Sequence, residues 1–158
     1  MFHFLNSKKK AFTLVEMLVV VTVIAILSSM ILVGMGGARA KARDARRIAD
    51  LHNIQNVLEL YFAQKGKYPP TPTGATDLAK WTSFVSTLTG AGLGVSQIPS
   101  DPINDTTYFY RYGADTSGTT YTLGAKLEQS DPALNSDIDG TSNGINCDDA
   151  SLVYCVKP

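Results

Sequence analysis

The chain begins with a long, nearly unbroken run of apolar residues. Residues 17–35 contain no charged side chain, and Thr22, Ser28 and Ser29 are their polar interruptions. About 19 helical residues extend about 28 Å, which is enough to cross the hydrocarbon core of a bilayer. Because backbone groups in lipid must bond within their own segment, this run predicts one membrane-spanning helix.

A second pattern follows, with the period of an amphipathic helix. Between residues 38 and 64 the apolar positions recur at spacings of three and four, which is typical of one buried helical face. The Tyr68-Pro69-Pro70 sequence predicts the end of this helix, since proline cannot continue it. One helix is therefore expected over residues 12–64, and the glycines at 34, 36 and 37 either loosen it or let helices approach closely. The apolar face comprises Ile48, Leu51, Ile54, Leu58, Tyr61 and Phe62.

The remaining residues predict a small head that contains β-structure. Turn-forming residues dominate residues 71–107, where one short helix is expected over 77–89. Residues 108–112 and 120–127 are rich in aromatic and β-branched residues and flank a turn at 115–118, so they predict an antiparallel hairpin.

A secretory signal peptide is the first alternative to a retained helix. Residues 8–10 are three lysines, and Ala38-Arg39-Ala40 is similar to a cleavage site. The apolar region of a signal peptide is about 7–15 residues long, which is shorter than this run. The helical pattern also continues beyond Ala40. We therefore expect the apolar helix to be retained.

One carboxylate, Glu16, directly precedes the uncharged run. A charge within an apolar span costs several kcal/mol, about 2.5 or more at the bilayer centre, and is tolerated where a partner neutralises it. An ammonium group about one turn away would form a charge-assisted pair that a low dielectric strengthens. Glu16 is therefore expected to need a cation.

The residues around Glu16 are similar to a known processing site. Residues 8–16, Lys-Lys-Lys-Ala-Phe-Thr-Leu-Val-Glu, resemble the leader junction of type IV pilins and type II secretion pseudopilins. The resemblance implies that a prepilin peptidase cuts between Ala11 and Phe12 and methylates the new amine, with Ala11 standing where the family usually has glycine. That amine would pair with Glu16 of the same or a neighbouring subunit, so Phe12 and Glu16 would direct assembly.

Residues 44–55 and 58–69 also resemble the major pseudopilin of type II secretion. The implied organisation is a cytoplasmic leader at 1–11, a transmembrane and assembly helix at 12–37, an amphipathic helix at 38–65 and a globular pilin-like head at 66–158. The implied function is a structural subunit of a type IV pilus or secretion pseudopilus. It would begin in the plasma (inner) membrane with its head outside the cytoplasm and end in a cell-surface or periplasmic filament.

The resemblance also implies the partners, which are identical or related pilin subunits, a prepilin peptidase, the assembly platform and membrane lipid. The alternative function is a single-pass, membrane-anchored monomer that displays a small calcium-binding domain. Such an anchor has no use for cleavage before Phe12, so cleavage separates the two hypotheses.

Acidic and amide side chains gather near the C-terminus. Asp137, Asp139, Asn143 and Asp148 are candidate calcium ligands, because closely spaced hard oxygen atoms suit Ca²⁺. The spacing is not that of an EF-hand loop. Major pseudopilins often bind calcium in this region, whereas the alternative is a solvated loop of Asx turns.

Cys147 and Cys155 are the two cysteines of the chain. In an exported head such a pair predicts a disulfide that stabilises by about 2–3 kcal/mol. Zinc is not expected, because no further cysteine or nearby histidine completes a ligand shell. The predicted fold class is α+β: a long helix packed on a small antiparallel sheet with a disulfide-closed C-terminal loop.

Charge is divided unevenly along the chain, although its formal net charge is zero. Residues 1–50 hold eight Lys or Arg against three acids, and residues 51–158 hold six against eleven. The basic residues at 39–47 predict contact with lipid headgroups, with non-specific DNA binding as the alternative. No phosphate-binding loop or nucleophile motif is found, so an enzyme is not expected.

Overall fold

The computed structural model describes residues 12–158, with the side chains at 30–35 left out. The predicted leader, including Ala11 at the expected cleavage site, lies outside the described residues. The chain divides into two compact units, Met1–Arg39 and Ala40–Pro158, which are described separately.

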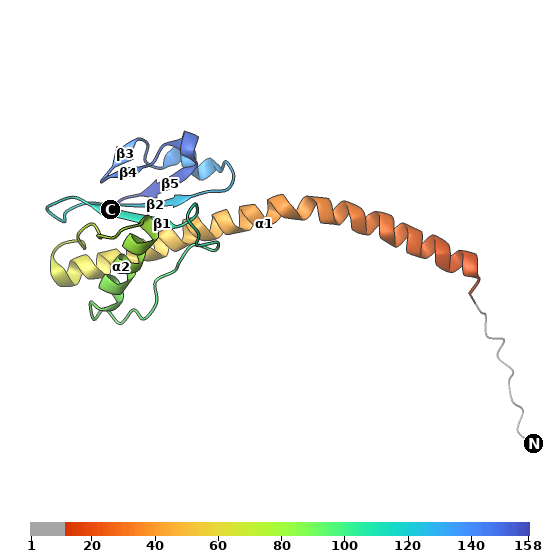
Figure 1. Ribbon diagram of the computed structural model, residues 1–158, viewed down its shortest axis with the longest axis horizontal. Coiled ribbons are helices and arrows are strands. Elements are labelled where there is room, and N and C mark those ends of the chain that lie inside the picture. Colours follow the sequence, from red (N-terminus) through yellow and green to blue (C-terminus); the bar gives the residue numbers. More distant parts are fainter. Residues whose placement is uncertain (1–11) are drawn as a thin grey trace, which may run out of the picture. The chain divides into compact units, whose positions relative to one another are not determined.

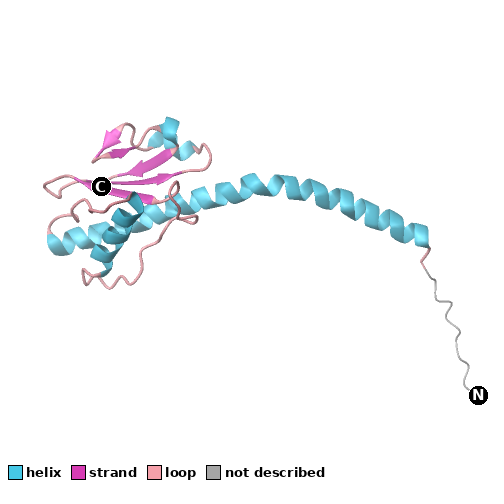
Figure 2. Ribbon diagram, in the orientation of Figure 1, coloured by secondary structure: helices cyan, strands magenta, loops and turns pink. Residues whose placement is uncertain are grey.

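The long helix expected from the sequence is present as α1 (Leu14–Lys65), and it is continuous through the glycines at 34, 36 and 37. Figures 1 and 2 show its C-terminal part, residues 40–65, beside the sheet of the head. It ends where Gly66 adopts a φ of 71° and its N–H donates to the Phe62 carbonyl at 2.7 Å. Glycine suits this left-handed helix end because it has no Cβ. The sequence therefore set this terminus correctly to within a residue.

The first unit exposes apolar side chains on every side of α1. Phe12, Leu14 and Val21 are 73%, 81% and 64% exposed. Most of the other large aliphatic side chains between Phe12 and Leu27 are also exposed. Across residues 12–29 and 36–158, no helix is both long and apolar enough to cross a membrane.

A three-stranded antiparallel sheet forms the centre of the second unit. Its strands β1 (Tyr110–Ala114), β2 (Tyr121–Lys126) and β5 (Val153–Val156) lie in the order β1-β2-β5. The predicted hairpin is thus confirmed, but its first strand begins two residues later than expected. The reason is an Asx turn, in which Asp105 Oδ1 accepts from the N–H groups of Thr107 and Tyr108 at 2.8 and 2.7 Å.

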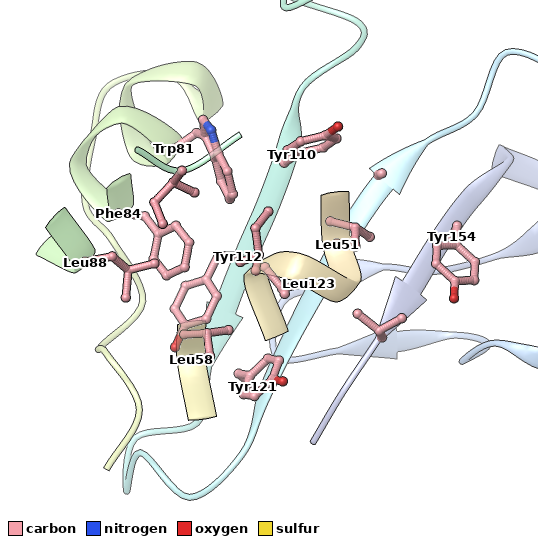
Figure 3. Close-up of a cluster of buried hydrophobic side chains, with 14 of the residues drawn as sticks. Leu51, Leu58, Trp81, Phe84, Leu88, Tyr110, Tyr112, Tyr121, Leu123 and Tyr154 are labelled. Carbon is pink, nitrogen blue, oxygen red and sulfur yellow. The ribbon is translucent and has the colours of Figure 1, made fainter. Parts of the chain in front are cut away.

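Two helices cover one face of this sheet and form the main core with it. The short helix α2 (Asp77–Thr89) has the predicted bounds and begins where the Thr76 hydroxyl accepts from the Ala79 N–H. Leu51, Ile54 and Leu58 of α1 are fully buried, as their spacing predicts. Figure 3 shows this cluster, in which the α2 ring of Phe84 stacks on the β1 ring of Tyr112 with centroids 4.1 Å apart.

The C-terminal segment covers the opposite face of the sheet. It forms η1 (Pro132–Ser136), the pair β3 (Thr141–Ser142) and β4 (Ile145–Asn146), η2 (Asp149–Ser151) and then β5. The short strands β3 and β4 within the predicted C-terminal loop were not expected, because strands of two residues carry no detectable period. The predicted disulfide is present between Cys147 and Cys155. Gly113 lets this segment approach, since a Cβ there would overlap the Asn143 carbonyl.

Candidate functional site

Glu16 is held at the N-terminal end of α1 by a reciprocal pair of hydrogen bonds. Its N–H donates to the Thr13 hydroxyl at 3.2 Å, and its Oε2 accepts from the Thr13 N–H at 3.3 Å. This is a capping box, in which two backbone donors that the helix leaves unpaired are satisfied. The Thr-x-x-Glu pattern before an apolar run signals this arrangement, and our sequence interpretation missed it.

The capping box places the carboxylate beside the expected new N-terminus. Oε2 also accepts from the Thr13 hydroxyl at 3.3 Å, so the described hydrogen bonds of the Glu16 carboxylate all use this one oxygen. The amine of Phe12 would lie one residue before the bonded Thr13 N–H. A negative charge is further favoured there by the helix dipole. The site can therefore hold a carboxylate ready for an ammonium group.

A second charged cluster lies within the head, centred on Arg47. The Arg47 side chain is fully buried and forms ion pairs with three carboxylates. Its distances to Asp44, Asp101 and Glu128 are each 2.7 Å. Arg43 also pairs with Glu128. Burial alone would lower the pKa of Arg47, but these hydrogen bonds raise it instead. The cluster joins α1 to two distant parts of the head.

This cluster changes the expected basic surface at residues 39–47. Arg47 is buried and Arg43 is bonded to Glu128, so the prediction that they face lipid or DNA is wrong for Arg47 and unsupported for Arg43. The cause is visible in the sequence, because Asp44 and Arg47 continue the three–four spacing of Leu51, Ile54 and Leu58. A charged pair on a buried face predicts internal partners.

A third group consists of carboxylates near the C-terminus. Carboxylate oxygens of Asp137, Asp139 and Asp149 lie within 4.8 Å of one another. Oδ1 of Asp137 and Oδ1 of Asp149 are buried and have no hydrogen-bond partner among the described residues. Burial, and then the charges of Asp149 and Asp139, raise the pKa of Asp137. Buried anions without partners are costly, and hard oxygen ligands at this spacing fit Ca²⁺.

The structure therefore brings together only part of the predicted ligand set. Asp137 and Asp139 meet, and Asp149 joins them. Asn143 instead donates from its side-chain amide to the Thr122 hydroxyl at 3.2 Å, and Asp148 lies outside the group. The disulfide supports the cluster, because the Cys155 N–H donates to Asp137 Oδ2 at 2.7 Å.

Two family models match this chain. Residues 6–32 match the prokaryotic N-terminal methylation motif, and residues 35–141 match type II secretion system (T2SS), protein G. The chain is 27% identical over 132 residues to the type II secretion system core protein G of Vibrio cholerae serotype O1, which covers 83% of this chain and 90% of that protein.

Two further relatives are also type II secretion system core protein G. The protein of Escherichia coli (strain K12) is 30% identical over 75 residues, or 48% of this chain and 52% of that protein. The protein of Aeromonas hydrophila is 30% identical over 69 residues, or 44% of this chain and 48% of that protein. These two matches span about half the length of each relative. No solved structure gives a significant match. Since the protein G model covers well over half of the sequence, the chain belongs to the type II secretion system protein G family and carries the N-terminal methylation motif.

Proposed function

We propose that this chain is a structural subunit of a type II secretion pseudopilus, which polymerises through the N-terminal part of α1. The observation that carries the proposal is the exposed apolar surface of that part, headed by the single carboxylate of Glu16. A helix that is apolar on every side is stable only when lipid or other protein surrounds it. The role is structural rather than catalytic.

The proposed surroundings change during assembly. Before assembly, the uncharged run of residues 17–35 lies in the inner membrane. After assembly, the same side chains pack against those of neighbouring subunits in the filament. Burying each large aliphatic side chain contributes about 1.5–3 kcal/mol, so many such residues give a strong association.

Processing supplies the cation that Glu16 needs. A prepilin peptidase cuts between Ala11 and Phe12, and the methylated amine of Phe12 pairs with Glu16 of the same or an adjacent subunit. The capping box supports this step because it already fixes the carboxylate next to Thr13. Pairing between subunits would set the axial spacing of the filament.

The disulfide supports a head outside the cytoplasm. Cys147 and Cys155 are joined, and disulfides persist in oxidising compartments such as the periplasm. The head therefore lies outside the cytoplasm, first on a membrane-anchored subunit and then on a periplasmic pseudopilus.

Intact mass and N-terminal sequencing test the processing step. The protein is isolated from membranes of cells with and without a prepilin peptidase. A peptidase-dependent start at Phe12 with one added methyl group is expected. An uncut chain that remains monomeric would instead indicate a simple membrane-anchored protein.

Assembly is tested with Glu16→Gln and Thr13→Ala, each scored for filament formation and for cleavage. Glu16→Gln removes the charge while keeping the shape, so cleaved subunits are expected to accumulate without filaments. Exposed Lys157→Gln is the matched control that removes a charge from the head. Normal filaments from Glu16→Gln would refute the ammonium pairing.

We further propose that Asp137, Asp139 and Asp149 bind calcium. The two unpartnered buried oxygens support this proposal, and bound Ca²⁺ would neutralise three carboxylates and tie η1 and η2 to the disulfide. Thermal unfolding with added CaCl₂ or MgCl₂ tests it. Asp149→Asn is expected to abolish the calcium-dependent rise in Tm, whereas Asp148→Asn should keep it; equal loss in both would refute this ligand set.

A further inference from the structure

A cavity lies in the head at the free edge of β1, between α2, which covers one face of the sheet, and the β3–β4 hairpin, which covers the other. Its volume is about 400 Å³, which is within the range of small-ligand sites. The first turn of α2, the strand β1 and the β3–β4 hairpin form its walls. Asp137, Asp139 and Asp149 do not line it, although Ser151 of η2 does, so the cavity is separate from the proposed calcium site.

The cavity contains an arginine, Arg111, that forms no ion pair within the described part of the chain, although Asp77 lies near enough for its charge to act on it. Arg111 alternates with the core residues Tyr110 and Tyr112 along β1, so it points away from the main core. Its Nη1 atom is buried and has no hydrogen-bond partner among the described residues. Its guanidinium lies 4.3 Å from the centroid of the Phe109 ring, which orients the group but does not neutralise it.

A second unpaired donor lines the same cavity. Trp81 of α2 is 4% exposed, and its Nε1–H has no partner among residues 12–158. Figure 3 shows the Trp81 ring beside Tyr110. Lys80 and Lys126 also line the cavity, and Asp77 is its one carboxylate, which is bound to Lys80 at 2.9 Å. Three cations thus face one acid that already has a partner.

We propose that this cavity binds a carboxylate attached to an apolar group. The planar guanidinium of Arg111 matches the two oxygens of a carboxylate, and charge-assisted bonds of this kind are strong. The Trp81 N–H supplies a further donor, and the aromatic walls suit an apolar body. The carboxylate belongs either to a free small acid or to the C-terminus of a peptide, which present the same chemistry.

Fluorescence of Trp81, the one tryptophan in the chain, provides a direct measurement. The full chain in detergent is titrated with phenylacetate and with its neutral analogue phenylacetamide. A second arm uses a short peptide ending in phenylalanine, with a free or an amidated C-terminus. We expect each carboxylate to bind at least about tenfold more tightly than its amide. Binding in the peptide arm alone would assign the carboxylate to a polypeptide, and equal binding by acids and amides would overturn the proposal.

Arg111→Gln is compared with Arg46→Gln, which removes the same charge from an exposed site on α1. Arg111→Gln is expected to lose the preference for the acid, whereas Arg46→Gln keeps it. Without a probe, Arg111→Gln should melt at or above the temperature of the unmodified protein, since it removes a buried charge that forms no ion pair within the described part of the chain. A lower melting temperature for Arg111→Gln, or unchanged acid binding, would show that Arg111 only supports the fold.

Discussion

Replacing Arg47 by methionine is the most informative single change in the head. Methionine fills much of the same space but carries no charge. Asp44 and Asp101, which are 1% and 3% exposed, would then lose their cation, while Glu128 would keep Arg43. The change therefore leaves two buried carboxylates without a charged partner.

The expected cost follows from the bonds that remain. Asp101 still accepts from the N–H of Ile103 at 2.8 Å, and Asp44 still accepts from the N–H of Glu128 at 2.9 Å. Removing one partner of a buried ion pair typically costs about 3–5 kcal/mol. A domain of this size is stable by about 5–15 kcal/mol, and Tm falls by about 4 °C per kcal/mol. We expect Arg47→Met to lower Tm by about 10–20 °C.

Thermal unfolding of the full chain, followed by circular dichroism and Trp81 fluorescence, measures this loss. Arg46→Met is the control, because Arg46 is mostly exposed and its ion pair with Asp50 spans 3.6 Å; it should change stability by less than about 0.5 kcal/mol. Adding Asp101→Asn to Arg47→Met should recover part of the loss, since it removes one unpaired charge. If Arg47→Met lay within about 1 kcal/mol of the control, the cluster would not hold the head together.

Three further predictions concern other contacts. Hydrogen bonds from Arg43 and Arg47 lower the pKa of Glu128 to about 2, although burial alone would raise it. Ionised Glu128 therefore stabilises the fold above about pH 5, and this contribution is lost as the pH falls toward 2. Glu128→Gln should flatten that part of the acid unfolding curve. Replacing both cysteines by serine should cost about 2.5 kcal/mol in urea unfolding, because the bond closes a loop of eight residues, and should also weaken calcium binding through Asp137. Gly113→Ala should cost about 1–3 kcal/mol by pushing the β3–β4 hairpin from the sheet, and an unchanged midpoint would contradict the close approach.

Local patterns predicted those parts of the fold that depend on neighbouring residues. The spacing of Leu51, Ile54 and Leu58 identified the buried face of α1, and the Tyr68-Pro69-Pro70 sequence identified its end. The bounds of α2 followed from its apolar spacing. The disulfide of Cys147 and Cys155 was predicted because they are the two cysteines of the chain and lie close together in a head expected to be exported. Each of these features depends on residues that are close together in the sequence.

Contacts between distant residues could not be predicted in this way. Arg47 meets Asp101 and Glu128 from 54 and 81 residues away, and no local pattern specifies those partners. Asp149 replaced Asp148 in the acidic cluster because the short helix η2 decides which carboxylate faces inward. The β3–β4 pair is too short to show a period. Folding of the C-terminal segment over the sheet creates all three features.

Arg47, Asp149 and Arg111 fall into two classes, those that stabilise the fold and those that bind a ligand. The sign of the change in stability on substitution distinguishes the two classes. Arg47 meets carboxylates of its own chain, so its removal should lower stability under every condition. Asp149 and Arg111 hold buried polar atoms without described partners, so neutralising either should raise the stability of the unliganded protein. The same changes should abolish stabilisation by calcium or by a carboxylate, since a ligand stabilises only the state it binds. Opposite signs with and without ligand would identify these two groups as binding sites, whereas a loss of stability in both conditions would make them parts of the fold alone.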